Sequence, residues 1–390
     1  MSAAVPLSTY ATEIYLHGLA GVRPAFTTDP DRLEAAAREA MSPETFGYVA
    51  GAASSGSTAR ENRAAFDRWR IVPRMLTGAT SRDLTTPVLG STLRAPVLTA
   101  PIGVQSIVHP DAELAAATVT AELGIGMIVS TLSSRTLEEV ADAHGDGCRW
   151  FQLYWPNDDD VCRSLLRRAN AAGYTVLVVT LDTWLLGWRP HDLDHGYLPF
   201  LTGEGLANYF SDEAFCAPLA RPPAEDPAAA VQRWVPCFTG TDRTWDQIAF
   251  LQQHWDGPIV LKGVQHPADA ERAAEVGVQG IVVSNHGGRQ VDGAVASLEA
   301  LPRIVEAVGS DLEVLFDSGI RTGSDVLKAL ALGARAVLVG RPWVYGLGLG
   351  GTDGVRHVLR GLLADTELAF GLSGNRTPAC LTRDALVRRP

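Results

Sequence analysis

The stretch Gly277-Val278-Gln279-Gly280-Ile281-Val282-Val283-Ser284 joins a helix-ending glycine to a short apolar strand that stops on a polar residue. The arrangement recurs at Gly124 before residues 127–130, at Gly173 before residues 177–180 and at Gly333 before residues 337–340. Glycine commonly ends helices in the left-handed conformation, and near-continuous apolar strands are those buried on both faces of a parallel sheet. The chain is therefore expected to contain repeated strand and helix units.

Four further apolar runs bring the number of predicted strands to eight: residues 97–100, 150–154, 259–262 and 314–317. Helical patterns such as residues 134–144 and 322–333 separate them. Eight such units predict an α/β fold of the (β/α)8 TIM-barrel type over residues 95–390. A doubly wound open sheet uses the same alternation and is the alternative. Residues 1–94 contain a helical pattern at 31–41 and are predicted to form an N-terminal helical cap.

Composition and net charge limit the kinds of molecule that the protein is expected to bind. The 390 residues carry a formal net charge of −11, which disfavours nucleic acid and anionic membrane surfaces, so an anionic substrate would need local arginines. The five cysteines form no C-x-x-C pair and suit reduced, structural thiols. No signal-peptide pattern precedes residue 15, and no run reaches the ~18 apolar residues of a membrane span. We expect a cytoplasmic protein without a metal site.

The ends of the predicted strands carry polar or backbone-exposing residues. Active sites of TIM barrels are built at the C-terminal ends of the strands. In chain order these residues are Pro101 and Gly103, Ser130, Gln152 and Tyr154, Thr180 and Asp182, Lys262, Ser284 and His286, Asp317 and Gly319, and Gly340 and Arg341. They are predicted to converge on one site.

The loops after the seventh and eighth strands have the composition of a phosphate site. They read Asp317-Ser318-Gly319-Ile320-Arg321 and Gly340-Arg341. Glycines there expose backbone N–H groups, and guanidinium groups match phosphate oxygens. The alternative for either loop alone is a turn glycine with a surface arginine. Both loops together favour bound phosphate.

Lys262, His286 and Arg289 supply the reactive groups. Lys262 ends an apolar strand, so its ammonium points into the barrel mouth and needs an anionic partner; a Schiff-base lysine is the rival role. His286 and Arg289 bracket Gly287-Gly288. A general base beside a carboxylate-binding guanidinium is what oxidation of a 2-hydroxy acid requires. A histidine on its own is more often a structural residue.

The segment Ser284-Asn285-His286-Gly287-Gly288-Arg289-Gln290 and the segment Asp317-Ser318-Gly319-Ile320-Arg321-Thr322-Gly323 resemble those of the FMN-dependent 2-hydroxy acid oxidases and dehydrogenases. The resemblance runs from about Tyr48 to the C-terminus. It implies FMN as cofactor, a 2-hydroxy acid as substrate, O2 as a further reactant and a homo-oligomer, either tetramer or octamer.

The resemblance also implies roles for matching residues. His286 takes the substrate hydroxyl proton and Asp182 stabilises the resulting imidazolium, while Tyr154 hydrogen-bonds near the reacting oxygen. The carboxylate is bound by Arg289, Arg189 and Tyr48. Lys262 lies beside N1 and O2 of the flavin. The remaining FMN contacts are Pro101, Ile102, Gly103, Ser130, Gln152, Thr180 and Ser284 for the ring, and Asp317, Gly319, Arg321, Gly340 and Arg341 for ribityl and phosphate.

A long insertion follows the fourth strand. Between Asp182 and Lys262 lie 79 residues, far more than the roughly 2–6 of a βα loop plus one helix. Its aromatic residues, Trp184, Trp188, Tyr197, Phe200, Tyr209 and Phe210, favour an active-site lid at about residues 183–243 over a disordered loop.

Within the family, residues 182–190, 198–200, 208–209, 13–15 and 101–104 resemble lactate 2-monooxygenase. That resemblance implies conversion of L-lactate and O2 to acetate, CO2 and water. Gly103 supports it, because many oxidases of the family have alanine there. The alternative is an oxidase that releases the 2-oxo acid and H2O2. His191 and residues 52–55 depart from the pattern and leave the substrate open.

Two alternative functions from other classes of protein remain, an NAD-dependent dehydrogenase and a non-catalytic binding protein. Gly346-Leu347-Gly348-Leu349-Gly350-Gly351 satisfies the G-x-G-x-x-G pattern of NAD-binding folds. Arg341-Pro342-Trp343 stands between it and the preceding strand, and no βαβ unit follows. A non-catalytic binding barrel would leave Lys262, His286 and Arg289 without a role.

Overall fold

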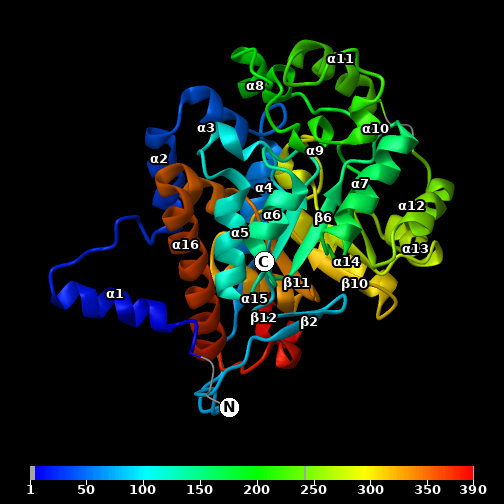
Figure 1. Ribbon diagram of the computed structural model, residues 1–390. Coiled ribbons are helices and arrows are strands. Elements are labelled where there is room, and N and C mark those ends of the chain that lie inside the picture. The colour runs from blue at the N-terminus through cyan, green and yellow to red at the C-terminus, as the bar shows by residue number, and fades with distance from the viewer. Residues whose placement is uncertain (1–4, 241–242, 390) are drawn as a thin grey trace.

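Eight parallel strands close into a barrel in the computed structural model, which describes residues 5–240 and 243–389 (Figure 1). The strands are, in chain order, β4 Val97–Thr99, β5 Gly126–Ser130, β6 Arg149–Leu153, β7 Leu177–Thr180, β8 Ile259–Val264, β9 Gly280–Val283, β10 Glu313–Phe316 and β11 Ala336–Val339. They neighbour one another in sequence order, and β11 pairs with β4 to close the ring. The predicted TIM barrel is confirmed and the open sheet is wrong.

Helices cover the outside of the barrel, one after each strand. They are α5 Ala112–Leu123, α6 Leu137–His144, α7 Asp159–Ala171, α12 Ile248–His254, α13 Pro267–Glu275, α14 Ser297–Val308, α15 Gly323–Ala331 and α16 Arg341–Leu372. The glycines predicted to end helices all have positive φ, at +67° for Gly124, +73° for Gly173, +78° for Gly277 and +105° for Gly333. Each turns the chain from a helix into the next strand, as the sequence predicts.

A hairpin of β2 Thr86–Val88 and β3 Ser91–Leu93 closes the N-terminal end of the barrel. Its apolar residues join one buried cluster with the inward-facing residues of the strands. Leu89 lies against the start of β10, where its backbone N–H donates to Glu313 at 3.2 Å. Because this end is filled, the open end of the barrel is the one where the strands finish.

The segment before the barrel contains strands as well as the predicted helices. Its helices are α1 Thr9–Leu19, α2 Pro30–Ala40, α3 Pro43–Ala50 and α4 Ser57–Asp67. Strand β1 Trp69–Ile71 pairs antiparallel with β12 Leu386–Arg388, which joins the segment before the barrel to the residues that follow α16. In Figure 1, α1 (blue) extends away from the barrel, whereas α2 lies along α16. Residues 1–4 of the predicted cap and residue 390 lie outside the described residues.

The insertion between β7 and β8 is packed, and the alternative of a disordered loop is wrong for its described residues. Its elements are α8 Pro190–Asp194, the 3-10 helix η2 Pro199–Thr202, α9 Ala207–Phe210, α10 Glu213–Cys216, α11 Pro227–Phe238 and η3 Trp245–Gln247. Residues 241–242, inside the predicted lid, lie outside the described residues. Buried aromatic rings form its core, and those of Trp234 and Phe238 stack 4.9 Å apart. The insertion lies above the barrel in Figure 1 (green).

Asn208 anchors the insertion to the barrel. It is completely buried, its Nδ2 donates to the carbonyl oxygen of Thr131 at 3.0 Å, and its Oδ1 accepts from the backbone N–H of Leu137 at 2.7 Å. Arg168 of α7 adds ion pairs with Glu138 and Asp212. This part of the insertion is therefore a fixed wall beside the ends of β5 and β6.

The G-x-G-x-x-G pattern lies inside α16, which is interrupted at Gly350 and Gly351. A Cβ on Gly346 would lie 2.6 Å from the carbonyl oxygen of Gly354, so the glycines allow two backbone segments to approach closely. The pattern does not open a helix after a strand, which disfavours the NAD reading. No helix in the described part of the chain has the length and apolar character needed to cross a lipid bilayer.

Candidate active site

A cavity opens at the C-terminal ends of the barrel strands. Its void is about 1190 Å³, counting the part open to solvent. The predicted site residues that line it are Tyr48, Pro101, Ile102, Gly103, Tyr154, Thr180, Arg189, Lys262, His286, Arg289, Asp317, Gly319, Arg321, Gly340 and Arg341. Ser130, Gln152, Asp182 and Ser284 stand behind them in hydrogen-bond contact. The structure thus brings the predicted residues together.

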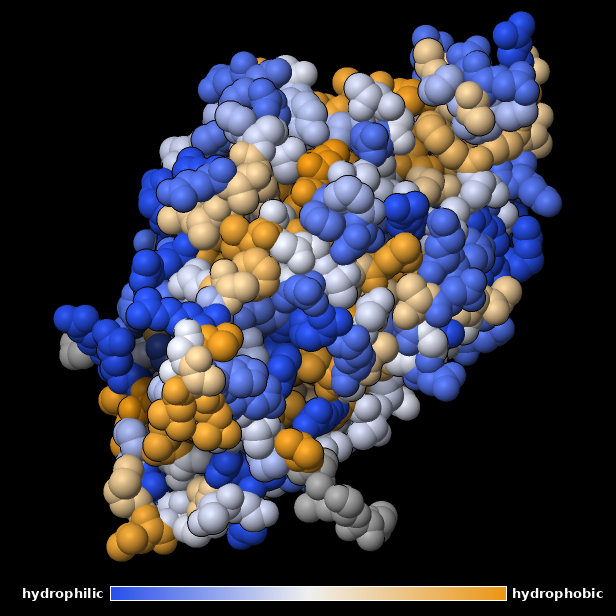
Figure 2. All heavy atoms as spheres, turned by 60° about the vertical axis from the view of Figure 1, so that its left-hand side comes forward, coloured by the Kyte–Doolittle hydropathy of each residue, from blue (hydrophilic) through white to orange (hydrophobic). Residues whose placement is uncertain are grey.

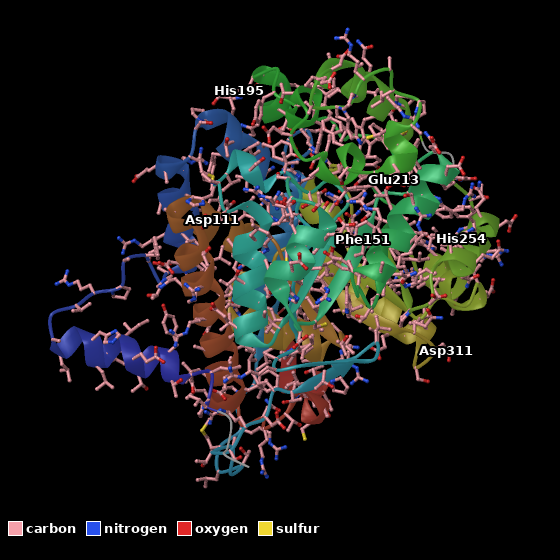
Figure 3. All side chains as sticks on the ribbon, in the orientation of Figure 1. Asp111, Phe151, His195, Glu213, His254 and Asp311 are labelled. Carbon is pink, nitrogen blue, oxygen red and sulfur yellow. The ribbon has the colours of Figure 1, made fainter. Side chains whose placement is uncertain are left out.

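His286 and Asp182 form a hydrogen-bonded pair at one side of the cavity. Nδ1 of His286 lies 2.8 Å from Oδ1 of Asp182. Thr183, which the sequence interpretation missed although it follows Asp182 directly, donates its hydroxyl to the same Oδ1 at 2.9 Å. The carboxylate holds the proton on Nδ1, so Nε2 is the free acceptor of the ring. By contrast, His195 and His254 lie at the periphery of the view in Figure 3.

The electrostatic surroundings keep His286 neutral and Asp182 ionised. Burial lowers the pKa of His286, and the positive charges of Lys262 and Arg189 lower it further, against the opposing effect of Asp182. Burial acts to raise the pKa of Asp182, but His286 and Lys262 bring it down to about 2. At neutral pH the pair is an imidazole held by a carboxylate, which is the arrangement of a general base.

The loop that carries His286 has a strained backbone. His286 has φ +58°, a region that costs residues other than glycine on the order of 1–3 kcal/mol. Asn285 holds the loop, since its Oδ1 accepts from the backbone N–H of Gly288 at 3.1 Å and from Nδ2 of Asn62 at 2.8 Å. Asn62, on α4, was missed in the sequence because its partner is 223 positions away.

Two guanidinium groups lie beside the base. Nη1 of Arg289 donates to the carbonyl oxygens of Tyr48 at 2.6 Å and Gly51 at 3.0 Å, which leaves the other N–H groups of this arginine for a ligand. Burial and the charges of Arg189 and Arg341 lower the pKa of Arg289 to about 9. Such a concentration of positive charge is stabilised by a bound anion.

Gln290 links this cluster to the insertion, and the sequence interpretation gave it no role. Its Oε1 accepts from Nη2 of Arg189 at 2.8 Å. Its Nε2 donates to the carbonyl oxygens of Asp182 and Leu185, both at 2.7 Å. One side chain therefore joins the histidine loop, the end of β7 and the arginine of the insertion.

Lys262 is paired and charged. Its Nζ lies 2.9 Å from Oδ2 of Asp317 and donates to Oγ of Ser284 at 2.9 Å. Burial acts to lower the pKa of Lys262, but the carboxylates of Asp317 and Asp182 raise it above its ordinary value. A Schiff-base lysine must lose its proton to act as a nucleophile, so this environment disfavours the aldolase reading.

Three polar side chains form a chain across the strands behind the cavity. Oγ of Ser130 donates to Oε1 of Gln152 at 3.1 Å, and Nε2 of Gln152 donates to Oγ1 of Thr180 at 2.9 Å. All three side chains are buried. The network fixes three polar side chains at the ends of β5, β6 and β7, behind the cavity.

The far end of the cavity is built for an anion. Gly319, Arg321, Gly340 and Arg341 line it, and α16 begins at Arg341. Burial and the neighbouring charge of Arg341 lower the pKa of Arg321 to about 10. Arg63, missed in the sequence, reaches this loop and pairs with Asp325 at 2.8 Å. The guanidinium group of Arg341 lies between this end and the histidine loop, where it donates to the carbonyl oxygens of Gly287 at 3.0 Å and Gly51 at 2.8 Å. The guanidinium group of Arg321 and the N-terminus of α16 are left to match a phosphate.

Comparisons with known proteins agree with this geometry. Residues 37–388 match the family described as FMN-dependent dehydrogenase. The chain is 49% identical to an FMN-dependent alpha-hydroxy acid dehydrogenase of Penicillium citrinum, over 98% of this chain and 96% of that protein. It is 40% identical to an L-lactate oxidase of Lysinibacillus sphaericus, over 91% and 92%. The crystal structure of a mandelate oxidase superposes with a TM-score of 0.82 at 38% identity, covering 93% of this chain and 98% of that one.

Proposed function

This chain belongs to the FMN-dependent dehydrogenase family, and from that premise we propose that it oxidises a small L-2-hydroxy acid with His286 as the base. Oxidation of a 2-hydroxy acid with FMN is the activity common to its relatives. The observation that carries the proposal is the His286–Asp182 pair, 2.8 Å between Nδ1 and Oδ1, beside the guanidinium groups of Arg189 and Arg289.

The cavity fits FMN at two places. Its phosphate matches the guanidinium group of Arg321, the N-terminus of α16 at Arg341 and the glycine backbones beside them. The polar edge of its ring matches the charged Lys262, which its partner Asp317 fixes. The residues proposed to contact the ring are Pro101, Ile102, Gly103, Ser130, Gln152, Thr180 and Ser284, and those for ribityl and phosphate are Asp317, Gly319, Arg321, Gly340 and Arg341. When bound, FMN accepts the two electrons that leave the alcohol carbon.

The protein side chains bind the substrate and move its proton. Arg289 and Arg189, with Tyr48, would hold the carboxylate and so present the hydroxyl group to Nε2 of His286. As the imidazole accepts the hydroxyl proton it becomes positively charged, and Asp182 stabilises that charge. Burial and the charge of Asp182 raise the pKa of Tyr154, so its hydroxyl stays protonated and donates a hydrogen bond near the reacting oxygen.

For the fate of the product we propose the lactate 2-monooxygenase outcome, in which L-lactate and O2 give acetate, CO2 and water. The insertion at about residues 183–243 would act as the lid. Leu186, Phe200 and Phe238 from it line the cavity, and its buried Arg189 faces the carboxylate site. An oxo acid held under this wall stays in place while oxygen reacts, which favours decarboxylation over release.

The second candidate is an oxidase that releases the 2-oxo acid with H2O2. The 40% identity to an L-lactate oxidase supports it. Product analysis separates the two. L-lactate in air is expected to give acetate and CO2 with little peroxide, and pyruvate with one equivalent of peroxide would refute the monooxygenase outcome. D-lactate serves as the matched control and is expected to remain unchanged.

We also propose a cytoplasmic homo-oligomer, a tetramer or octamer. Apolar side chains are strongly exposed on α1 and on the turn after β1, among them Leu16, Leu19, Met75 and Leu76. Figure 2 shows apolar groups gathered at the lower left of the face that it presents. Patches of this kind are typical of contacts between proteins. Light scattering of the purified protein tests the proposal, and a monomer would contradict it.

A further inference from the structure

Gly263 is the extra residue of a bulge in β8. In the pairing of β8 with β9, Lys262 lies opposite Val282 and Val264 lies opposite Val283, so Gly263 has no partner of its own. Its φ is +112°, which glycine adopts and other residues avoid. Bulges beside active sites change the direction of neighbouring side chains. This one follows directly after Lys262, whose ammonium faces Asp317 in the barrel mouth.

The missing side chain of Gly263 leaves room for the carboxylate of Asp182. A Cβ at position 263 would lie 2.9 Å from Cβ of Asp182 and 3.0 Å from its Cγ and Oδ2. Carbon atoms that are not bonded prefer separations of about 3.5–4.0 Å, so even a methyl group would displace the carboxylate. The backbone cannot retreat freely, because the N–H of Leu181 donates to the carbonyl oxygen of Lys262 at 2.9 Å.

Only one of the two carboxylate oxygens of Asp182 forms hydrogen bonds with the described residues. Its Oδ1 contacts His286 and Thr183, whereas its Oδ2 is buried and has no hydrogen-bond partner among the described residues. Oδ2 is also the oxygen that faces Gly263. The position of the carboxylate therefore depends on the space at Gly263 as much as on its hydrogen bonds.

We propose that Gly263 is a positioning residue for the His286–Asp182 pair, because the absence of a side chain there lets the carboxylate of Asp182 reach Nδ1 of His286. The proposal rests on the role proposed above for His286 as the base. Gly263 would then have two effects. It sets the direction of Lys262, and it permits the contact between Asp182 and His286 that orients the imidazole.

Gly263→Ala is expected to lower turnover about 10- to 100-fold, the scale of losing a hydrogen bond to a charged group. Flavin binding should persist, because the methyl group points at Asp182. The displaced carboxylate raises the pKa of His286 less than it does in the parent protein, so the imidazole should titrate at lower pH. A merely structural defect would lower the yield of folded protein without moving this titration.

Gly277→Ala is the matched control for backbone strain. Gly277 has φ +78°, and a Cβ there would meet only Nε2 of Gln252, at 3.7 Å. It ends α13, on the outside of the barrel. This variant should unfold at lower temperature and keep its turnover and the titration of His286 unchanged.

The deciding experiment combines a double-mutant cycle with histidine titration by NMR. Removing the whole side chain in Asp182→Gly, Cβ included, makes room for the methyl group, so Gly263→Ala should cost no further turnover in that background. If the two substitutions instead lower turnover by independent factors that multiply in the double variant, the proposal is wrong. If Gly263→Ala alone fails to fold, the double variant should fold, because only backbone strain of the kind that Gly277→Ala also carries is left; failure of the double variant where Gly277→Ala folds would contradict the proposal.

The titration uses protein labelled with 13C at histidine Cε1, with the His286 signal assigned from His286→Gln. An unchanged titration in Gly263→Ala would refute the proposal. The titration is measured without turnover. It therefore reports the contact between Asp182 and His286 whether or not the protein catalyses the reaction. A parent protein that oxidises no 2-hydroxy acid would refute the proposed function while the titration still tests Gly263.

Discussion

Oδ1 of Asp182 lies 2.8 Å from Nδ1 of His286, although 104 positions separate the two residues in the chain. The pair sets the pH dependence of the reaction. The base must be neutral, and burial lowers the pKa of His286 below its ordinary value of 6.5. The ratio kcat/KM should therefore stay level near neutrality and fall as the pH drops through a value below 6.5. A pH profile measures this, and an acid limb above 6.5 would contradict the assignment.

His286→Gln should keep FMN and lose about 10²- to 10⁴-fold in turnover, the usual contribution of a general base. Glutamine conserves volume and hydrogen-bonding capacity but cannot accept the proton. The visible spectrum reports bound flavin, and stopped-flow reduction reports the reaction. His17→Gln, on the exposed α1, is the control and should behave as the parent protein. Normal reduction of His286→Gln would remove His286 from its role.

Lys262→Met should destabilise the protein by about 3–5 kcal/mol, because it leaves the buried Asp317 without its partner at 2.9 Å. Affinity for FMN should fall as well. Urea unfolding and fluorescence titration with FMN measure the two effects. The double variant Lys262→Met with Asp317→Asn should recover part of the stability. An unchanged unfolding midpoint in the single variant would show that the pair is not required.

Arg289→Lys should raise KM for the hydroxy acid by about 10- to 100-fold, since lysine lacks the planar fork that binds a carboxylate and also loses the contacts to the carbonyl oxygens of Tyr48 and Gly51. Steady-state kinetics with L-lactate provides the measurement. Arg356→Lys, on the outer face of α16, is the control and should leave KM unchanged. Equal KM values for the parent protein and Arg289→Lys would argue against a carboxylate clamp.

Asn208→Ala should loosen the insertion, because two hydrogen bonds to the loop after β5 are lost from a completely buried site. Stability should fall by about 1–3 kcal/mol. If the insertion retains the oxo acid, more peroxide should form per lactate consumed. Asn170→Ala on α7 is the control for stability and for peroxide yield. An unchanged amount of peroxide per lactate consumed would show that the insertion does not determine the fate of the product.

The barrel could be predicted from the sequence because its signals are local. Every strand contains a short apolar run, and four of the eight follow a helix-ending glycine with positive φ, as at Gly277 before β9. The order of eight such units then places the strand ends on one face. His286, Lys262 and Arg341 were located this way, since each stands within three residues of a strand end.

The supporting contacts could not be predicted, because they join distant parts of the chain. The amide groups of Asn62 and Asn285 meet across 223 positions, and Gln290 reaches Arg189 across 101. The bulge at Gly263 exists only in the pairing of two strands. Gly103 was interpreted as support for the resemblance to lactate 2-monooxygenase, and the structure adds that a Cβ there would collide with the carbonyl oxygen of Leu132.

The central claim is that this barrel passes two electrons from a 2-hydroxy acid to bound FMN. Anaerobic mixing of the purified yellow protein with L-lactate, followed by a short series of other L-2-hydroxy acids, tests it most directly. The flavin absorbance in the visible range is expected to disappear within seconds and to return when air is admitted. A protein that binds no FMN, or one whose flavin stays oxidised with every 2-hydroxy acid offered, would contradict it.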